Sequence, residues 1–357
     1  MVNSDLPDNV LHNILTRLPS KPLFRSRCVS KHWNRLMSDP FFMNSRSRRK
    51  ILVSTSSLDL HLIDDNVPVT DDMNHSIVNL PNSGDHTGAT VVGSFNGIVL
   101  LVFSGTTDMI LYNPLTRASK KVPDPPCRYN YQQSSYAFGF GYGATTPDDL
   151  KIVKTQVHSD GLWANFQEFD LKTSVWSRPQ CFDPWYAYYE SKCGVFLNGY
   201  LYWVASIILF LEPVIVAYNV EKRVSSRIYV PDGCEDMSKN LLGIVNGYLC
   251  MMMCLEYDEY NVWVMKKGIW LQGVKNSWSK AYSFKIHLHS YPSCIYILDQ
   301  GKYLMVDSYG KFYIHDTSKK HQCEPRLIHL NGDNCYQVHG IEYAESLIPP
   351  SDILGKI

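Results

Sequence analysis

Apolar positions near the N-terminus recur at spacings of one, three and four, the pattern of short amphipathic helices. The first stripe consists of Val10, Leu11, Ile14, Leu15 and Leu18. Pro7 suits the first turn of that helix, and Pro19 ends it. Ser20 and Ser30 are placed to cap a second and a third helix, and Pro40 follows the third. The pattern therefore predicts three short helices.

Helices this short cannot bury all of their apolar surface among themselves. The spare apolar stripe is therefore expected to lie against another protein. The alternative is that it packs against the rest of this chain.

From about residue 90 the pattern changes to short apolar strands that repeat roughly every fifty residues. Each unit opens with a turn dipeptide, at Asn96-Gly97, Asp148-Asp149, Asn198-Gly199, Asn246-Gly247 and Gln300-Gly301. The intervals between these turns are 52, 50, 48 and 54 residues. Asn-Gly favours the type I′ turn of a β-hairpin, because both central residues of that turn need a positive φ. Another apolar strand, which ends in Asn or Asp, follows each turn and its apolar run. Each unit therefore offers about four short strands.

A single four-stranded sheet leaves both faces exposed, whereas several sheets arranged radially bury them, as in a β-propeller. Five units lie between about residues 90 and 330. Two further strand-like stretches, 50–63 and 338–348, are expected to share one closing blade. The count favours six blades and leaves seven, or a distorted ring, as alternatives. The polar stretch 64–90 is predicted to be a long loop.

Formal charge divides the chain into the same two parts. The whole chain has 34 basic and 34 acidic residues. Residues 1–50 hold ten basic and three acidic residues, a net charge of +7, and the remainder is −7. This division indicates two modules with different partners.

The N-terminal string MVNSDLPDNV has acidic residues and no apolar run, unlike a secretory signal. The most apolar run, 200–211, is too short to span a bilayer and is predicted to form strands. The ten cysteines are scattered without a CxxC pair or zinc-finger spacing, which favours reduced thiols. We therefore expect the cytoplasm or the nucleus as the location, with no membrane contact.

The N-terminal string DLPDNVLHNILTRLPSKPLFRSRCVSKHWNRLM resembles an F-box in the order and spacing of its features. The matching features are Leu6-Pro7, Ile14-Leu15, Arg17-Leu18-Pro19, Lys21, Leu23, Arg25-Ser26-Arg27, Cys28 to Lys31, and Trp33. The resemblance implies docking on a Skp-type adaptor and, through it, on the cullin and RING protein of an SCF ubiquitin-protein ligase. The candidate adaptor-binding residues are the F-box positions Leu6, Pro7, Ile14, Leu15, Leu18, Pro19, Leu23, Val29 and Trp33.

The rest of the chain resembles the F-box-associated, kelch-like domain of plant F-box proteins. The resemblance rests on SFNGIVLLV, ILYNPLTRASKKVP, YAFGFGYGATTPDDLKIVK and YAESLIP. In that family this region is the substrate receptor. We expect an α+β multidomain chain: an all-α three-helix F-box at 1–45, a basic linker at 46–50, an all-β propeller at 51–350 and a tail at 351–357.

An aromatic segment, FDPWYAYYE, falls between two repeat units, where a loop is expected. Exposed together, its aromatic residues would form a recognition patch for a substrate protein. The candidate substrate-binding residues are Trp185, Tyr186, Tyr188 and Tyr189, with Tyr129 and Tyr131 in a similar segment. The alternative is that these side chains cover the end of the propeller core.

The sequence contains no Ser–His–Asp order, nucleophile elbow, Walker loop or HExxH motif. We therefore expect no catalytic residue, cofactor or metal, and interpret the chain as a non-catalytic substrate receptor. One alternative is a nucleic-acid binder that uses the basic head, although a solvated positive face is enough to explain those residues. The other alternative is a propeller enzyme.

Overall fold

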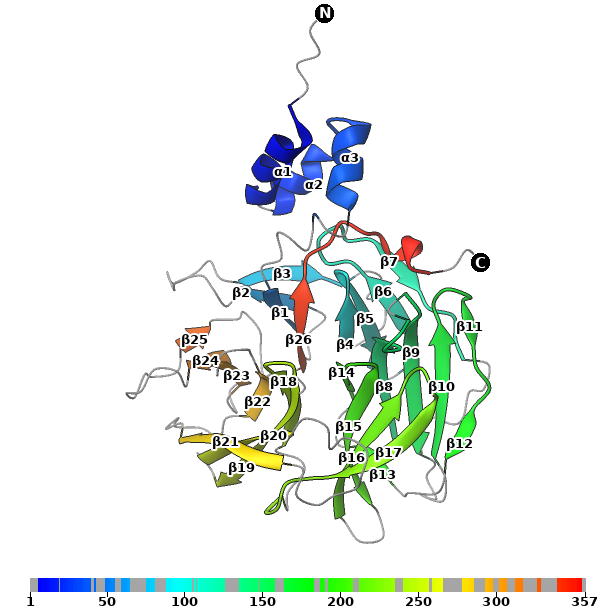
Figure 1. The fold of residues 1–357 in the computed structure, drawn as a ribbon, viewed down its shortest axis with the longest axis vertical. Helices are drawn as coiled ribbons and strands as arrows, with labels where there is room; N and C mark the ends of the chain where they lie inside the picture. Colours follow the sequence, from blue (N-terminus) through cyan, green and yellow to red (C-terminus); the bar gives the residue numbers. More distant parts are fainter. Residues whose placement is uncertain are drawn as a thin grey trace, which may run out of the picture.

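The chain folds as three short helices followed by a six-bladed β-propeller (Figure 1). The computed structural model describes residues 6–18, 20–39, 42, 49–54, 59–64, 75–80, 88–104, 106, 108–125, 135–146, 148–157, 164–182, 187–189, 192–207, 212–234, 240–256, 259–265, 278–285, 293–297, 302–306, 312–316, 326–328 and 339–354.

The three predicted helices are confirmed, as α1 (Asp8–Arg17), α2 (Ser20–Ser26) and α3 (Lys31–Ser38). Ser30 caps α3 as predicted, because its side-chain oxygen accepts a hydrogen bond from the backbone nitrogen of Trp33 at 3.1 Å. Ser20 is the first residue of α2. None of the described helices is long and apolar enough to cross a membrane.

The described strands form six antiparallel sheets, which we number as blades 1 to 6. Blade 1 contains β26 (His339–Ala344), β1 (Arg49–Ser54), β2 (Asp59–Asp64) and β3 (His75–Asn79). Blade 2 contains β4 (Ala89–Phe95), β5 (Ile98–Phe103), β6 (Met109–Tyr112) and β7 (Ser119–Lys121). Blade 3 contains β8 (Ser135–Tyr142), β9 (Leu150–Val157), β10 (Ala164–Asp170), β11 (Val175–Trp176) and β12 (Gln180–Phe182). Blade 4 contains β13 (Ala187–Tyr189), β14 (Val195–Leu197), β15 (Tyr200–Ile207), β16 (Glu212–Asn219) and β17 (Val224–Tyr229). Blade 5 contains β18 (Leu241–Val245), β19 (Tyr248–Glu256), β20 (Glu259–Met265) and β21 (Trp278–Lys285). Blade 6 contains β22 (Ser293–Ile297), β23 (Lys302–Val306), β24 (Phe312–Asp316) and β25 (Arg326–Ile328).

Blade 1 closes the ring by joining the two ends of the propeller. Strand β26 pairs with β1 over its whole length, from Arg49 opposite Ala344 to Ser54 opposite His339. This confirms the shared closing blade and the count of six. The prediction of one long loop over 64–90 was wrong at 75–79, where β3 pairs with β2. Strand β3 is the outermost strand of its blade, so only one of its edges pairs with another strand. Its five residues also carry too short an apolar pattern for the strand to be recognised in the sequence.

The three predicted Asn-Gly hairpin turns are also confirmed. Asp148-Asp149 lies in a longer connection that joins β8 to β9, and Gln300-Gly301 lies outside the described residues. Asn96, Asn198 and Asn246 have φ of 46°, 49° and 51°, and the glycine after each of them has φ of 74° or more. These are the positive angles that a type I′ turn requires. Each of these turns joins the first strand of a blade to the second, so the repeat in the sequence corresponds to the blade.

The apolar core is divided into clusters that each lie between two neighbouring blades. One such cluster joins blades 2 and 3, and others join blades 1 and 2, 3 and 4, 4 and 5, and 5 and 6. Around the centre, the inner strands contact one another in the order β26, β4, β8, β14, β18, β22 and back to β26. Radial packing therefore buries both faces of each sheet, as the repeat predicted.

Candidate protein-binding surfaces

The first helix presents two apolar rows on different faces. Leu6, Val10 and Ile14, spaced four residues apart, are 52, 39 and 45% exposed. Leu11 and Leu15, also four apart, are 2 and 0% exposed. Leu6 precedes the helix, which begins at Asp8, and is exposed beside its first turn. Residues four apart share one face of a helix, so Val10 and Ile14 face solvent and Leu11 and Leu15 face the interior.

Two more apolar side chains of the head, the module formed by α1 to α3, reach solvent. Phe24 of α2 is 38% exposed, and Val29, between α2 and α3, is 63% exposed. The guanidinium carbon of Arg27 lies 5.9 Å from the centroid of the Phe24 ring, which is a cation–π contact. The head thus has apolar contact area and positive charge side by side.

The structure sorts the nine candidate adaptor-binding residues by burial. Leu6, Pro7, Ile14 and Val29 are exposed, Leu18 and Trp33 are half-buried, and Leu15 and Leu23 are buried. Pro19 lies outside the described residues. Val10 and Phe24 are exposed but were not among the nine. The four-residue spacing from Leu6 to Ile14 is the sequence signal that could have found Val10.

The buried row of α1 packs against the propeller itself. Leu11, Leu15 and Leu23 share an apolar cluster with Leu347, which is 0% exposed, and Leu115 packs against the same cluster. Leu347 follows the closing strand β26, and Leu115 lies between β6 and β7. One row is therefore covered in part by the chain's own propeller, as the alternative expected, and the other is exposed. A partner for the exposed row stays a prediction.

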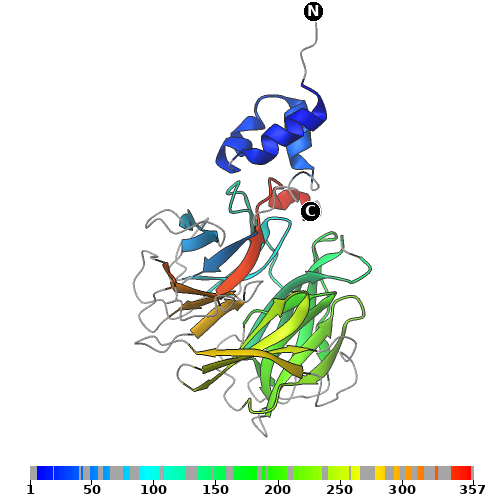
Figure 2. The ribbon, with the colours of Figure 1, turned by 60° about the vertical axis from the view of Figure 1, so that its left-hand side comes forward.

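The segment after β26 is fixed between the head and the ring by several polar contacts. Asn113 donates hydrogen bonds from Nδ2 to the backbone oxygens of Ser346 at 2.9 Å and Ile348 at 2.7 Å. Nearby, the ammonium group of Lys50 pairs with the carboxylate of Glu345 at 2.6 Å. In two views this C-terminal segment, drawn in red, lies between the helices and the propeller (Figures 1 and 2).

The head defines one face of the ring, which we call the helix face. A side-chain Cβ at Gly97, in the turn between β4 and β5, would lie 2.3 Å from the Cβ of Ser346, so that turn is at the helix face. In an antiparallel sheet the chain reverses at every strand end. The first-to-second and third-to-fourth connections of each blade are thus at the helix face. The strand ends that the second-to-third connections and the links between blades join are at the opposite face, the distal face.

The aromatic substrate candidates flank or occupy links between blades. Tyr188 and Tyr189 lie on β13, which pairs with the distal end of β15, at residues 205–207. Phe182 ends β12, which pairs with the distal start of β10. Trp185, Tyr186, Tyr129 and Tyr131 lie outside the described residues, and so do the side chains of Tyr188 and Tyr189.

A buried charged network crosses from blade 3 to blade 4. Glu168 is 3% exposed, and its carboxylate lies 2.6 Å from Arg223 Nε and 3.9 Å from Lys151 Nζ. The hydroxyl of Tyr218 donates a hydrogen bond to the other carboxylate oxygen at 2.8 Å. Burial, and then the adjacent carboxylate, raise the pKa of Tyr218 above its ordinary value. The phenol therefore stays neutral and links the two blades.

In the part of the chain that the structure describes, no group of three His, Cys, Asp or Glu side chains could hold a metal ion. The surfaces described above offer apolar contact area and charge, which are features of protein recognition.

Comparison with known proteins gives matches over both modules. Residues 3–44 match the F-box domain, and residues 42–350 match the F-box associated beta propeller domain. F-box protein CPR1 of Arabidopsis thaliana is 26% identical over 90% of this chain and 84% of its own length. The F-box/kelch-repeat protein At3g23880 of the same plant is 24% identical over 78% of this chain and 79% of its own length. The helices, the closed ring and these matches together show that the chain belongs to the plant F-box proteins with an F-box-associated β-propeller domain.

Proposed function

We propose that this chain is the substrate-recognition subunit of an SCF-type ubiquitin-protein ligase, working in the cytoplasm or the nucleus. The head docks on a Skp-type adaptor, which connects it to the cullin and the RING protein. The ring holds a target protein for ubiquitination and proteasomal degradation. The observation that carries the proposal is the exposed apolar row of α1, on a head whose opposite row is already packed against the ring.

The ring acts in this proposal by binding and without catalysis of its own. Holding a target near the ubiquitin-charged enzyme raises the effective concentration of the target lysine, and this can accelerate transfer without a catalytic group in the receptor. The buried contacts around Leu347 support this role, because a head fixed to the ring sets where the target is presented.

Adaptor binding is tested by charge substitution within the exposed row. Ile14→Asp should weaken binding of a purified Skp-type adaptor by about 30-fold or more, since truncation of an interface anchor typically costs 2 kcal/mol or more. Val224→Asp is the matched control, because Val224 on β17 is 50% exposed and lies on the propeller. Equal adaptor affinity for wild type and Ile14→Asp would contradict the docking proposal. Leu15 is unsuitable for this test, because its burial makes a charge there disrupt the head itself.

The receptor role is tested in cells with the proteasome inhibited. Wild type and Ile14→Asp should capture the same target proteins through the ring, but only wild type should lead to their ubiquitination. Targets that carry ubiquitin equally with both forms would show that the ring does not work through the adaptor.

A further inference from the structure

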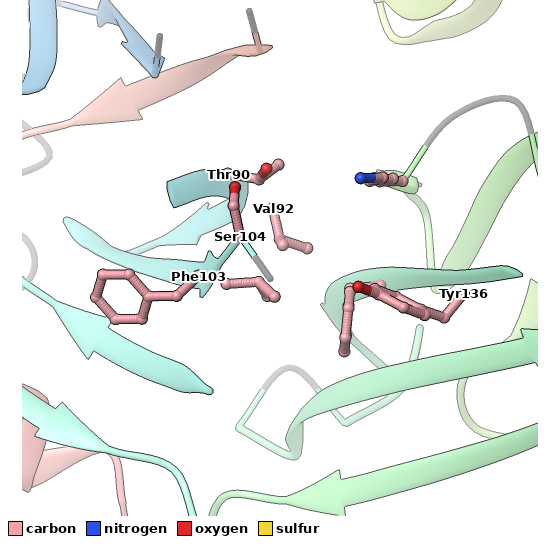
Figure 3. Close-up of a pocket in the computed structure, with 8 residues that line it drawn as sticks. Thr90, Val92, Phe103, Ser104 and Tyr136 are labelled. Carbon is pink, nitrogen blue, oxygen red and sulfur yellow. The ribbon is translucent and has the colours of Figure 1, made fainter. Parts of the chain in front are cut away.

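A pocket of about 210 Å³ lies between blades 2 and 3 (Figure 3). Its polar groups come from Thr90, Ser104, Tyr136 and Lys192, and its apolar lining includes Val92 and Val102. Figure 3 shows Thr90 and Ser104 on one side and Tyr136 across from them. Thr90 lies seven residues before the helix-face turn at Gly97, or about 20 Å along the strand. The pocket is therefore on the side of the ring away from the head.

The backbone of residues 192–194 fixes Lys192 at this place. The oxygen of Lys192 accepts a hydrogen bond from the nitrogen of Phe138 at 2.8 Å, and the nitrogen of Gly194 donates to the oxygen of Phe138 at 2.7 Å. The thiol of Cys193 contacts the backbone oxygen of Val91, on β4, at 3.5 Å. The segment thus bridges the inner strands of blades 2 and 3 and holds Lys192 beside the pocket between them.

Lys192 is the one formally charged side chain among the pocket's lining residues, all of which the structure describes. Burial, with a smaller contribution from the Lys192 ammonium, lowers the pKa of His339 to about 4. That imidazole is neutral near pH 7 and adds no charge of its own. The pocket therefore combines one positive charge with three hydroxyl groups.

The same interblade space has further polar groups behind the pocket. On the blade 3 sheet, Tyr136 lies opposite Gln156, which lies opposite Asn165, and cross-strand partners share one face. In the next row Phe138 lies opposite Lys154, which lies opposite Gln167, so the buried Lys154 ammonium shares this face of the sheet. The amides of Gln156, Asn165 and Gln167 are 1% exposed, and their side-chain nitrogen and oxygen atoms make no hydrogen bond within the part of the chain that the structure describes. Since buried polar groups are normally hydrogen-bonded, this half of the interblade space favours a polar guest over an apolar one.

We propose that this pocket binds the side-chain carboxylate of an Asp or Glu of the recruited protein, with Lys192 as its counter-ion and with hydrogen bonds from Thr90, Ser104 and Tyr136. The inference rests on the proposed function, because it names the substrate class of the same ring: proteins that present an acidic side chain to the distal face.

Size and charge together select this ligand class. At about 30 Å³ for each water, the pocket has the volume of about seven waters, below the roughly 300–1,000 Å³ of sites for larger small molecules. One side chain fills such a space, with its methylene groups against Val92 and Val102. Bidentate recognition of a phosphate group depends on the planar fork of an arginine, and none of the lining residues is an arginine. A single ammonium group with hydroxyl donors suits a carboxylate.

The probe for this pocket is N-acetyl-glutamate α-amide, which carries one carboxylate on its side chain. The probe is titrated to about 20 mM into the full-length chain with ¹³C-methyl-labelled valine, and binding is followed by NMR. We expect a dissociation constant of the probe near 1 mM, which corresponds to a binding free energy of about −4 kcal/mol. The methyl signals of Val92 and Val102 should shift and saturate. Lys192 is itself exposed, so Lys192→Gln should weaken the affinity about two- to fivefold, as expected for loss of one solvent-exposed ion pair. Lys172→Gln is the matched control, because Lys172 is exposed like Lys192 but lies in the turn after β10, at the helix face and away from the pocket.

Three results would overturn the assignment. The first is an absence of methyl shifts in wild type at the highest probe concentration. The second is an equal affinity for the neutral N-acetyl-glutamine α-amide, or for Lys192→Gln. The third is tighter binding of N-acetyl-phosphoserine amide than of the glutamate probe, which would assign the pocket to phosphate.

Adaptor binding by the same variants separates this inference from the proposed function. Lys192→Gln should bind the Skp-type adaptor as wild type does, because Lys192 lies on the other side of the ring from the head. If wild type fails to bind the adaptor, the proposed function is wrong, while the titration still decides whether the pocket takes a carboxylate.

Discussion

The guanidinium of Arg27 donates a hydrogen bond from Nη1 to the backbone oxygen of Leu347 at 3.2 Å, although 320 residues separate them in the sequence. The side chain of Leu347 is at the same time fully buried among Leu11 and Leu15 of the head. Leu347 follows β26, the strand that closes the ring. The core of the head and the closure of the propeller thus share one segment, which fixes the orientation of the head on the ring.

Replacement of Leu347 by alanine should loosen the head. Truncation of a buried leucine typically costs about 2–5 kcal/mol, because apolar contacts are lost and a cavity is left. We expect faster amide hydrogen exchange in α1, α2 and α3, measured by mass spectrometry on the full-length chain.

Leu354→Ala is the matched control for that measurement. Leu354 is 4% exposed and packs in the cluster between blades 2 and 3 instead of in the head. It should destabilise the ring without preferential exchange in the helices. If both variants leave the helices equally protected, Leu347 does not stabilise the head.

Gly97 should be needed for two reasons: its turn requires a positive φ, and the segment around Ser346 packs closely against it. Its φ is +74°, and an added Cβ would lie 2.3 Å from the Cβ of Ser346. Gly247 has a φ of +76° in the corresponding turn of blade 5, with nothing within 4 Å of an added Cβ. Alanine at Gly247 should therefore cost only about 1–2 kcal/mol for the left-handed backbone. Alanine at Gly97 should cost more, because the segment beyond β26 must also shift.

Urea unfolding of the two alanine variants measures this difference in the free energy of unfolding. Hydrogen exchange should also show a loosened head in Gly97→Ala alone. Equal losses of stability in the two variants would mean that the segment around Ser346 moves aside without cost.

The sequence predicted those parts of the fold whose cause is local. Asn-Gly turns depend on the backbone preferences of two neighbouring residues, so Asn96, Asn198 and Asn246 could be recognised without any tertiary information. The cap at Ser30 is local in the same way. The period of about fifty residues then indicated the ring, because each blade repeats the same local pattern.

The division of the apolar stripe on α1 could not be predicted in this way. Val10 and Leu11 are both apolar and differ only in what packs on them. Leu11 is buried in a cluster that joins Leu23 and Met37 of the head to Leu347, from the far end of the chain. Burial on β9 has a similar origin: Lys154 is 1% exposed because blade 2 and blade 3 pack together over it. Contacts over such separations leave no periodic signal.

The amide of Asn113 should contribute more to stability than that of Asn219, its counterpart in blade 4. Both side-chain oxygens accept two hydrogen bonds from the backbone of the following turn. Asn113 also donates to the backbone oxygens of Ser346 and Ile348. Alanine at Asn219 should cost about 1–2 kcal/mol for the turn, and alanine at Asn113 about 1–2 kcal/mol more.

Urea unfolding compares the two asparagine variants, and limited proteolysis reports on the C-terminal segment. Cleavage after β26 should become faster in Asn113→Ala and stay at the wild-type rate in Asn219→Ala. If proteolysis is unchanged in both, Asn113 does not anchor that segment.

Lys154 should make the stability of the propeller depend on pH. Burial lowers the pKa of its ammonium group from the ordinary 10.5 to about 8 in the folded chain. Between pH 8 and 10.5 the folded state has released this proton while the unfolded state still holds it. The unfolded state binds more protons there, so the free energy of unfolding rises with pH across this window. Below pH 8 the buried charge costs roughly 3 kcal/mol.

Lys154→Met removes the charge and keeps most of the side-chain length. It should be more stable than wild type at pH 7, by up to roughly 3 kcal/mol, and the difference should shrink as the pH rises above 8. Comparison at each pH cancels the titration of groups that both proteins share, such as the tyrosines that ionise near pH 10. Lys172→Met, at an exposed lysine, should show a constant difference from wild type. A constant difference for Lys154→Met as well, across pH 7 to about 9.5, would mean that burial does not disfavour the charge on Lys154.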